Sequence, residues 1–347
     1  MFLLECDSIP EVYTQVLQLV IEKGKAIQPR GYKCLEISPL CISASSPRKR
    51  LFGTPGRNEN PIFAYIEGLW VLTADDSPII PSHYVKQTLC YINPQTGRFD
   101  GAYGPRIRNA SGIDQLTAAY QRLLNDRDTR RAVITIFDPT KDCASNSLDI
   151  PCTVSWQFLI RDNKLDMIAY MRSNDLFRGF VYDTAEFQWF QEILAGWLGV
   201  EVGKYFHIVG SAHVYLSDEA KIRKMLSGPS GTQRFSLYEA SEPQDARLPR
   251  PEFEVEINNL ASIEAKSRTA MLTEEGAEAI RSAFHCKFYR NLALAIAAYN
   301  FRRVGNIRLC EKLVDFIDNE LRLLMLEREQ FSQSFPNPVP LNFNREG

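Results

Sequence analysis

The spacing of apolar residues divides the chain into helical and extended segments. Apolar residues recur every three or four positions in four segments, which predicts helices over 9–25, 61–73, 113–125 and 184–199. Short apolar or alternating runs predict strands over 34–37, 132–137, 154–160, 165–171, 205–216 and 252–258. The polar tetrapeptide 161–164 lies between two of these runs, so we expect those two strands to form a hairpin.

The last quarter of the chain follows a helical period throughout. From residue 273 the apolar positions repeat every 3.6 residues and predict helices over 273–302 and 306–329. This part carries no candidate chemistry, so we interpret it as an added helical layer or a dimer surface. Three segments rich in Gly, Pro, Ser or Arg predict irregular loops at 43–60, 100–108 and 227–250.

Composition narrows the class of protein. Hydrophobic residues make up 45% of the chain, enough for an ordinary globular core. The 40 basic and 42 acidic residues give a net charge of −2, which argues against a dedicated nucleic-acid binder. Two basic clusters, Arg48–Arg50 and Arg130-Arg131, are by themselves typical of solvated surfaces. No apolar run is long enough for a membrane span and no secretory signal precedes the chain, so we expect a cytoplasmic protein.

The eight cysteines indicate reduced thiols rather than a metal site. No pair has C-x-x-C spacing, and there are only four histidines, so we expect no zinc and no other metal. Reduced cysteines are typical of the cytoplasm.

One cysteine lies in a setting typical of a nucleophile. Cys152 follows Pro151 at the entrance of the predicted strand 154–160. The segment Arg172-Ser173-Asn174-Asp175 offers a guanidinium, a hydroxyl, an amide and a carboxylate within four residues. A thiolate nucleophile needs a lowered pKa, which adjacent arginines supply, and the polar groups of this segment suit the binding of an anion. Glu67, among apolar neighbours, is either a surface carboxylate or a buried acid or base with a shifted pKa.

Six motifs, in order, resemble the thymidylate synthase family, which includes the pyrimidine nucleotide hydroxymethylases. The span of the resemblance is roughly 60–216. The motifs are Glu67-Gly-Leu-Trp70, Tyr103-Gly104 with Arg108, Arg130-Arg131 ahead of Asp138-Pro139, Asp149-Ile-Pro-Cys152, Arg172-Ser-Asn-Asp175 with Gly179, and His213-Val-Tyr215. The resemblance implies an α+β fold with a large mixed sheet packed by helices. We expect residues 1–265 to form the catalytic domain and 266–347 to form a helical extension packed on it.

The resemblance also implies roles for the residues of these motifs. Cys152 would be the nucleophile, while Glu67 and Tyr103 would hold waters that move protons. The phosphate would be bound by Arg172 and Ser173 and, across a homodimer, by Arg130 and Arg131 of the other subunit. His213 and Tyr215 would hold the sugar hydroxyl. Arg30 and Asn174 are further substrate-binding candidates, and Asp175, Trp70 and Gly179 are candidates for the folate site.

One departure from the synthases lies at the position that would bind the pyrimidine base. Synthases place an asparagine that reads uracil where this chain has Asp183. A carboxyl group accepts from the N4 amine of cytosine and shares a proton with N3, so Asp183 suits cytosine as a binding and catalytic residue. The alternative is that Asp183 only caps a helix beginning at Thr184.

Other departures also weaken the case for ordinary dTMP synthesis. Thr153 stands where synthases have histidine, and no tryptophan lies between 71 and 155, the part of the chain where synthases carry one near the folate. The folate-closing C-terminal segment of the synthases is not recognisable in 339–347.

The resemblance therefore predicts a cytidylate 5-hydroxymethylase. Cys152 would add to C6 of dCMP or CMP, C5 would take the one-carbon unit of 5,10-methylenetetrahydrofolate, and water would complete the hydroxymethyl group. The paired arginines favour dCMP over CMP. Alternatives are dUMP methylation and a nucleotide-binding regulator without activity, although the intact Cys152, Glu67 and Arg172 speak against the regulator. A thiol protease would need a separate His–Asn/Asp partner set.

Overall fold

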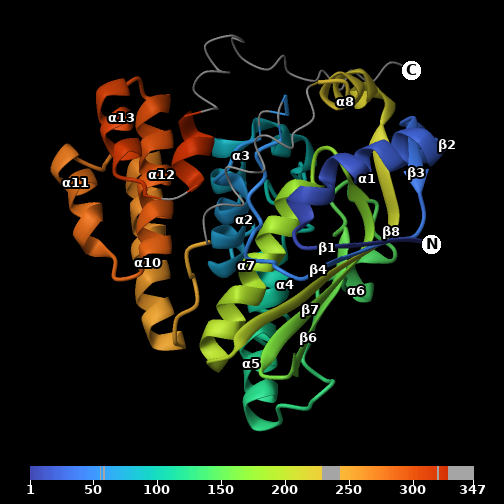
Figure 1. Ribbon diagram of the computed structural model, residues 1–347, viewed down its shortest axis with the longest axis horizontal. Coiled ribbons are helices and arrows are strands. Elements are labelled where there is room, and N and C mark those ends of the chain that lie inside the picture. Colours follow the sequence, from blue (N-terminus) through green and yellow to red (C-terminus); the bar gives the residue numbers. More distant parts are fainter. Residues whose placement is uncertain (55, 58, 229–242, 319, 327–347) are drawn as a thin grey trace.

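A mixed β-sheet organises the part of the chain that the computed structural model describes, namely all residues except 55, 58, 229–242, 319 and 327–347 (Figure 1). Its order is β1-β4-β8-β7-β6-β5, with β3 also paired to β8 and β2 to β3. Pairs β1–β4 and β7–β8 are parallel and the others antiparallel. The strands are β1 (Phe2–Cys6), β2 (Lys25–Ile27), β3 (Cys34–Ile37), β4 (Leu40–Ala44), β5 (Val133–Thr135), β6 (Thr153–Arg161), β7 (Lys164–Asp175) and β8 (Glu201–Tyr215).

Helices cover one face of this sheet and extend beyond it. Their bounds are α1 (Ile9–Lys23), α2 (Phe63–Leu72), α3 (Ile79–Tyr84), α4 (Tyr103–Arg108), α5 (Gln115–Asn125), α6 (Pro139–Asp142), α7 (Phe180–Leu198), α8 (Glu219–Leu226), α10 (Arg250–Arg268), α11 (Glu274–Ala283), α12 (Lys287–Arg303) and α13 (Ile307–Asp315). The α+β class and the mixed sheet expected from the sequence are therefore confirmed.

Helix α7 is the centre of the packing because it is buried nearly all round. Trp156 of β6 packs against Phe187 and Phe190 of α7, which joins the helix to the sheet. On the side away from the sheet, Trp197 contacts Phe253 of α10. Figure 1 shows the resulting layers, with α10–α13 on the left, α2 and α7 in the middle and the strands on the right. A helix that is apolar on every side is typical of such a central position.

The β6–β7 hairpin is confirmed. Its turn residues Asp162 and Asn163 have φ values of 49° and 57°, the left-handed conformation that tight two-residue hairpin turns require. Aspartate and asparagine tolerate this region better than other non-glycine residues. The hairpin brings the start of β6 next to the end of β7, where the two most distinctive sequence motifs lie.

Four sequence predictions of secondary structure are wrong, one of them the helix expected at 306–329, which is interrupted at residues 316–318. Segment 252–258 is helical, within α10, and Phe253, Glu256 and Leu260 are buried at helical spacing. The loop expected at 100–108 contains α4. The helix expected from 273 to 302 is broken between α11 and α12.

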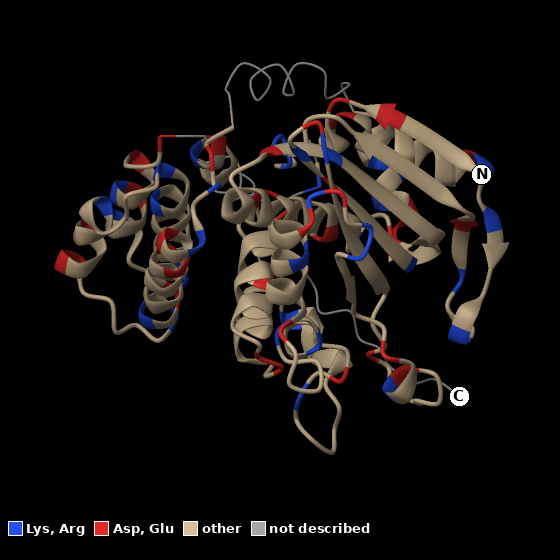
Figure 2. Ribbon diagram, turned by 90° about the horizontal axis from the view of Figure 1, so that it is seen from below, with Lys and Arg blue, Asp and Glu red and all other residues tan. Residues whose placement is uncertain are grey.

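The basic cluster Arg48–Arg50 is not a solvated surface. Arg50 is 2% exposed and forms an ion pair of 2.6 Å with Glu192 of α7, which is itself buried. Arg48 donates from Nε to the same carboxylate at 2.9 Å. Elsewhere, acidic and basic residues alternate without a single-sign face on the side shown in Figure 2. The described helices include none with the length and apolar content of a membrane span.

Some sequence predictions fall on residues outside the described part of the chain. Residues 229–242 of the predicted loop 227–250 and the C-terminal segment 339–347 lie outside the described residues. Helix α10 runs across residue 265, the expected boundary between catalytic domain and helical extension. The eight cysteines all lie in the described part of the chain, and none is in a disulfide bond.

Candidate active site

Cys152 and Arg172 lie side by side because β6 and β7 form a hairpin. The backbone N–H of Arg172 donates to the Cys152 carbonyl at 2.8 Å. The Arg172 guanidinium then turns back over the approach to the cysteine, donating from Nε to the Pro151 carbonyl at 2.9 Å and from Nη2 to the Ile150 carbonyl at 2.8 Å. Arg172 therefore fixes the backbone that presents the thiol, and its charge stays exposed.

Burial raises the pKa of the Cys152 thiol, and the Arg172 guanidinium opposes that rise without outweighing it. The Asp183 and Asp149 carboxyl groups raise this pKa further, and Arg30 lowers it slightly. Arg172 and Arg30 act on the thiol pKa in the expected direction, but the net shift is upward because desolvation of the thiolate is the larger effect.

Tyr103 is hydrogen-bonded to the residue after the cysteine. Its hydroxyl accepts from the Thr153 backbone N–H at 3.2 Å and donates to Thr153 Oγ1 at 3.0 Å. Burial raises the pKa of Tyr103, and the neighbouring Cys152 and Asp183 add to the rise. The phenol therefore keeps its proton at neutral pH. Thr153, a departure from the synthases, is thus part of the contact that places Tyr103 beside the thiol.

Glu67 belongs to a cluster of three carboxyl groups. Burial raises the pKa of Glu67 well above its ordinary value, and Asp183 raises it further. The pKa of Glu186 rises for the same reasons, with contributions from Glu67 and Asp183. Glu186 is 4% exposed, and its Oε1 has no hydrogen-bond partner among the described residues. The surface interpretation of Glu67 is therefore wrong, and burial favours the protonated forms of these carboxyl groups.

Sequence reasoning missed Glu186. It lies three residues after Asp183, where it was read only as part of a helix. A carboxylate on the buried face of an apolar helix was the available signal, as it was for Glu67.

Asp183 lies inside the first turn of α7. The helix begins at Phe180, and the Asp183 N–H donates to the Gly179 carbonyl at 3.0 Å, so the interpretation of Asp183 as a helix cap is wrong. Burial raises the pKa of Asp183 to about 7, while a hydrogen bond from Asn174 opposes the rise. A Cβ on Gly179 would lie 3.0 Å from Asp183 Oδ2, so a larger residue at this position would require the carboxyl to shift by a few tenths of an ångström.

Asn174 connects Asp183 to two residues that the sequence did not single out. Its Nδ2 donates to Asp183 Oδ2 at 2.7 Å, and its Oδ1 lies 3.0 Å from His207 Nε2. The other ring nitrogen of His207 lies 2.8 Å from the Tyr205 hydroxyl. Burial lowers the pKa of His207 to about 3, so the imidazole is neutral. The apolar pattern of β8 did not indicate that His207 and Tyr205 form polar contacts.

The remaining polar candidates lie around the ends of β7 and β8. Ser173 Oγ is 3.4 Å from His213 Nδ1, and the His213 and Tyr215 rings meet edge to face with centroids 5.3 Å apart. Two residues apart on one strand, His213 and Tyr215 share a face, as expected. Arg30 is exposed in the turn between β2 and β3, close enough to affect the pKa of Cys152.

The three candidates for the folate site differ in their surroundings. Asp175 Oδ1 accepts from the backbone N–H groups of Phe177 and Arg178, both at 2.9 Å, while its Oδ2 is buried without a hydrogen bond in the described residues. Burial raises the pKa of Asp175. Trp70 packs edge to face on Phe99 at 5.6 Å.

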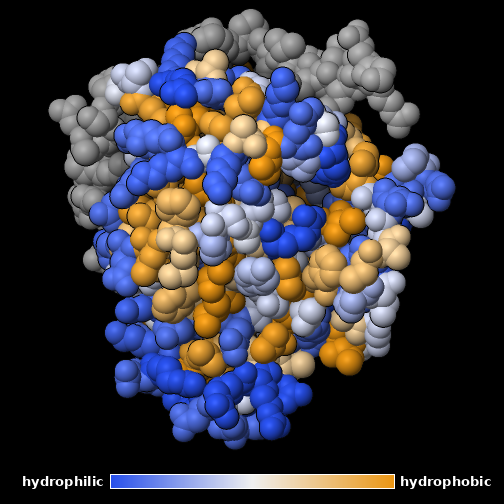
Figure 3. All heavy atoms as spheres, turned by 90° about the vertical axis from the view of Figure 1, so that its right-hand side faces the viewer, coloured by the Kyte–Doolittle hydropathy of each residue, from blue (hydrophilic) through white to orange (hydrophobic). Residues whose placement is uncertain are grey.

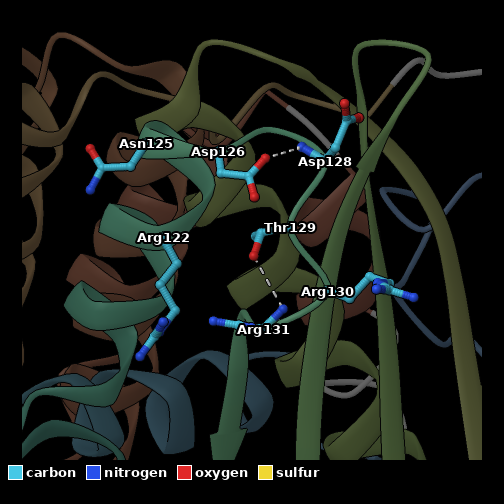
Figure 4. A pocket seen from close by; sticks show the side chains of 7 residues that line it. All are labelled: Arg122, Asn125, Asp126, Asp128, Thr129, Arg130 and Arg131. Carbon is cyan, nitrogen blue, oxygen red and sulfur yellow. Dashed lines mark hydrogen bonds between the residues drawn. The ribbon is translucent and has the colours of Figure 1, made fainter.

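Arg130 and Arg131 lie away from these groups, on the loop that follows α5. Their hydrogen bonds are local: the Arg131 N–H donates to Thr129 Oγ1 at 3.3 Å, and Gln157 donates to the Arg130 carbonyl at 3.0 Å. They border an open pocket of about 530 Å³ with Arg122 and Asp126, and Figure 4 shows the Arg130 side chain directed away from the other arginines. Both residues are exposed and could reach a neighbouring molecule.

Within the described residues, no group of three or more His, Cys, Asp or Glu side chains is placed to hold a metal ion.

Comparison with known proteins finds relatives whose names agree with the matching family profile. The thymidylate synthase family profile matches residues 66–259. A deoxyuridylate hydroxymethyltransferase of Bacillus phage SP01 is 37% identical over 220 residues, 60% of this chain and 57% of the relative. A protein of the same name from Pseudomonas phage M6 is 31% identical over 71% of each chain. A thymidylate synthase of Phytoplasma mali is 33% identical over 36% of this chain and 42% of its own length.

The profile covers more than half of the chain, and it includes the segments that hold Cys152, Arg172, Asp183 and His213. The match to the phage M6 protein extends over more than two thirds of both chains. This chain belongs to the thymidylate synthase family.

Proposed function

We propose that this protein transfers a one-carbon unit to C5 of deoxycytidylate and leaves it as a hydroxymethyl group. The observation that carries the choice of base is Asp183, a half-buried carboxyl in the first turn of α7 with a pKa raised to about 7. At neutral pH such a group presents both an O–H donor and an oxygen acceptor.

Cytosine and uracil present opposite patterns to such a group. Cytosine has an acceptor at N3 and a donor at N4, so a protonated Asp183 donates to N3 and accepts from N4. Uracil has a donor at N3 and an acceptor at O4, so an ionised Asp183 leaves one oxygen facing O4 without a proton, and a protonated Asp183 matches uracil only when the proton is on the oxygen that faces O4. An unpaired buried polar group costs about 1–3 kcal/mol, and sites built around one hydrogen-bonding pattern can discriminate by orders of magnitude.

The protein groups around Cys152 suit the chemistry of C5 substitution. The thiolate adds to C6 of the pyrimidine and makes C5 nucleophilic. 5,10-Methylenetetrahydrofolate supplies the one-carbon unit when bound, and Asp175 with Trp70 and Gly179 would hold it. Glu67, with its raised pKa, orients the water that completes the hydroxymethyl group, and Tyr103 moves a proton beside the thiol.

The nucleotide would be bound through its phosphate and sugar. Arg172 and Ser173 would contact the phosphate, with Arg30 at the rim, and His213 and Tyr215 would bind the sugar hydroxyl. Arg130 and Arg131 are exposed on the loop after α5, and we propose that they contribute from a second copy of the chain.

A homodimer has support in the uncovered face of the sheet. Buried residues of β6, β7 and β8 point toward α7, and alternate residues on the opposite face are half-buried or exposed although several are apolar, including Leu159, Ile168, Tyr170, Phe206 and Ile208. Figure 3 shows apolar side chains gathered among polar ones on this side of the molecule. An apolar sheet face without a covering layer is typical of a subunit interface.

Hydroxymethylation of deoxyuridylate is the second candidate. It is favoured by the names of the two phage relatives, which are called deoxyuridylate hydroxymethyltransferases. The two candidates share every step except the reading of the base.

The deciding experiment is to incubate the protein with 5,10-methylenetetrahydrofolate and dCMP, CMP or dUMP and to identify products by mass. We expect a gain of one hydroxymethyl group on dCMP and little product from dUMP. Asp183→Asn should reverse this preference, because an amide accepts from uracil N3–H and donates to O4. Preference for dUMP in the unmodified protein, or an unchanged preference in Asp183→Asn, would refute the cytidylate assignment.

A further inference from the structure

Three buried polar residues form a series of hydrogen bonds that ends at the carboxyl group of Asp183. Tyr205 and His207 of β8 have no exposed surface, and Asn174 of β7 is 3% exposed. Successive contacts of 2.8, 3.0 and 2.7 Å join Tyr205 to His207, His207 to Asn174 and Asn174 to Asp183. Buried polar groups on three different elements rarely line up in this way without a purpose in structure or chemistry.

The acceptor role of Asp183, the last residue in this series, determines which group donates in every hydrogen bond of the series. An ionised Asp183 only accepts, so Asn174 presents its Nδ2 amine to Oδ2. The Asn174 carbonyl then faces His207, and Nε2 of His207 has to carry the proton. That tautomer leaves Nδ1 as an acceptor, which takes the proton of the Tyr205 hydroxyl. The direction is the same when Asp183 is protonated on Oδ1.

We infer that Tyr205, His207 and Asn174 are positioning residues that hold Asp183 Oδ2 as an acceptor and so assign the carboxyl proton to Oδ1. This inference rests on the proposed function and adds the residues that determine its base specificity. Oδ2 accepts from Asn174 and keeps a second lone pair for the N4 amine of cytosine. Oδ1 receives no hydrogen bond from the described residues and is available to donate to N3.

The surroundings of Asp183 favour the same arrangement. Burial raises its pKa, Asn174 opposes the rise and Asp175 adds to it. The titratable side chains whose charges interact with Asp183 come from several elements, namely Glu67 (α2), Tyr103 (α4), Cys152 (before β6), Asp175 (β7), Glu186 (α7) and Tyr205 (β8). None of these groups is cationic, so the donor from Asn174 is what limits the rise.

The test measures dissociation constants of dCMP and dUMP in the Cys152→Ala background, where no covalent adduct forms. We expect His207→Phe and Asn174→Ala each to reduce the dCMP-to-dUMP affinity ratio by about tenfold, the effect of losing one defined hydrogen-bond partner. Tyr205→Phe should reduce it less, because only the tautomer of His207 is released. His207→Gln should restore part of the ratio, since its amide can donate to Asn174.

A matched control is Tyr289→Phe. The Tyr289 hydroxyl is also buried and donates one hydrogen bond, to the Ala246 carbonyl at 3.1 Å, but it lies among the C-terminal helices. We expect this variant to keep the affinity ratio.

The pH dependence separates positioning from a general loss of structure. Removal of the Asn174 donor should raise the pKa of Asp183, so dCMP binding in Asn174→Ala should persist to higher pH than in the background protein. Unchanged affinity ratios in His207→Phe and Asn174→Ala would overturn the inference. If those two variants do not fold, an unchanged ratio in Tyr205→Phe would overturn it instead. In either case, dCMP turnover by the unmodified protein would still support the proposed function. Preference of the unmodified protein for dUMP would refute both.

Discussion

At the scale of single residues, the site uses burial to keep protons on acidic groups. Asp183, Glu67 and Glu186 are all carboxyl groups whose pKa values are raised mainly by loss of solvent. Cys152 is subject to the same effect, which opposes formation of the thiolate. The Cys152 thiol of one chain therefore ionises less readily than a free thiol, and additional positive charge nearby would favour the thiolate.

Asp183→Asn should stabilise the protein, and more so at higher pH. The pKa of Asp183 is 3.8 as a free group and about 7 when folded, so the folded chain holds this proton more tightly than the unfolded chain. The free energy of unfolding contributed by Asp183 therefore falls as pH rises from about 4 to 7 and then levels off. We expect a Tm increase of about 4 °C or more at pH 8 and a smaller one at pH 5.

Thermal unfolding of both proteins across this pH range checks the sign. Asp128→Asn, a change at an exposed position, serves as the control and should shift Tm little at either pH. A Tm difference that does not grow with pH would show that Asp183 is already ionised in the folded protein.

Cys152→Ala should abolish turnover but retain most nucleotide affinity, because the phosphate and the base are bound by other groups.

Arg172→Ala should affect both turnover and nucleotide affinity. Its side chain is the expected phosphate contact, and it also supports the carbonyls of Ile150 and Pro151 before the cysteine. Nucleotide binding in Arg172→Ala should weaken by about 2–4 kcal/mol. Calorimetric titration and a turnover assay separate the two losses, and undiminished turnover in Cys152→Ala would contradict the mechanism.

At the scale of elements, α7 connects the base-reading turn to the rest of the core. Asp183 lies near its start, and Glu192, three turns later, binds Arg48 and Arg50 and accepts from the Ala246 N–H at 3.0 Å. This one carboxylate therefore joins the segment after β4, the helix α7 and the chain that leads into α10. Because both ionic partners converge on a buried group, loss of one of them leaves charge without compensation.

Arg50→Ala should destabilise the protein by about 3–5 kcal/mol, the usual cost of removing one partner of a buried ion pair. Arg223→Ala is a suitable control because Arg223 pairs with Glu219 on the exposed face of α8, and its loss should cost about 0.5 kcal/mol or less. Denaturant unfolding measures both changes. Equal, small effects would show that Glu192 is stabilised mainly by its other contacts.

The elements that sequence predicted well are those with a strong local pattern. The β6–β7 hairpin combines two apolar runs with Asp162-Asn163, and both the strands and the turn are confirmed. The strand expected at 252–258 is instead part of α10, because a short run of Phe253, Val255 and Ile257 fits a strand as well as a helix until its neighbours are known.

The candidate site divides in a similar way. Motif residues such as Cys152 and Arg172 could be identified because their types and order are distinctive. Glu186, His207 and Tyr205 could not, because their importance arises from contacts across elements that no local pattern records. The pKa of Cys152 was misjudged for the same reason, since burial depends on the whole fold.

At the scale of the whole molecule, the proposed phosphate site draws on arginines that lie in different parts of the chain. Arg172 and Ser173 lie near Cys152, whereas Arg130 and Arg131 are exposed on the loop after α5. The uncovered sheet face that includes Ile168 and Tyr170 provides a surface through which a second copy could bring these arginines into reach. The proposed dimer would then have two sites, each built from both subunits.

Mixing Arg130→Ala and Cys152→Ala proteins tests this arrangement. Each variant alone should be nearly inactive, but a mixed dimer has one site with both Cys152 and a partner's Arg130. Random exchange of subunits should restore about a quarter of the activity of the unmodified protein. Absence of any recovery, with subunit exchange verified by mass, would refute the shared site.

Trp197 is an intrinsic fluorescent probe of the contact between α7 and the C-terminal helices. Its ring packs on Phe253 with centroids 5.4 Å apart, and the Arg250 guanidinium lies 5.0 Å from its centre. Both contacts come from α10, whereas Trp197 belongs to α7. Intrinsic fluorescence of this indole therefore reports whether the C-terminal helices are docked, in a protein whose other three tryptophans lie at 70, 156 and 189. Partial detachment of that layer would be visible as a spectral change before any substrate is added.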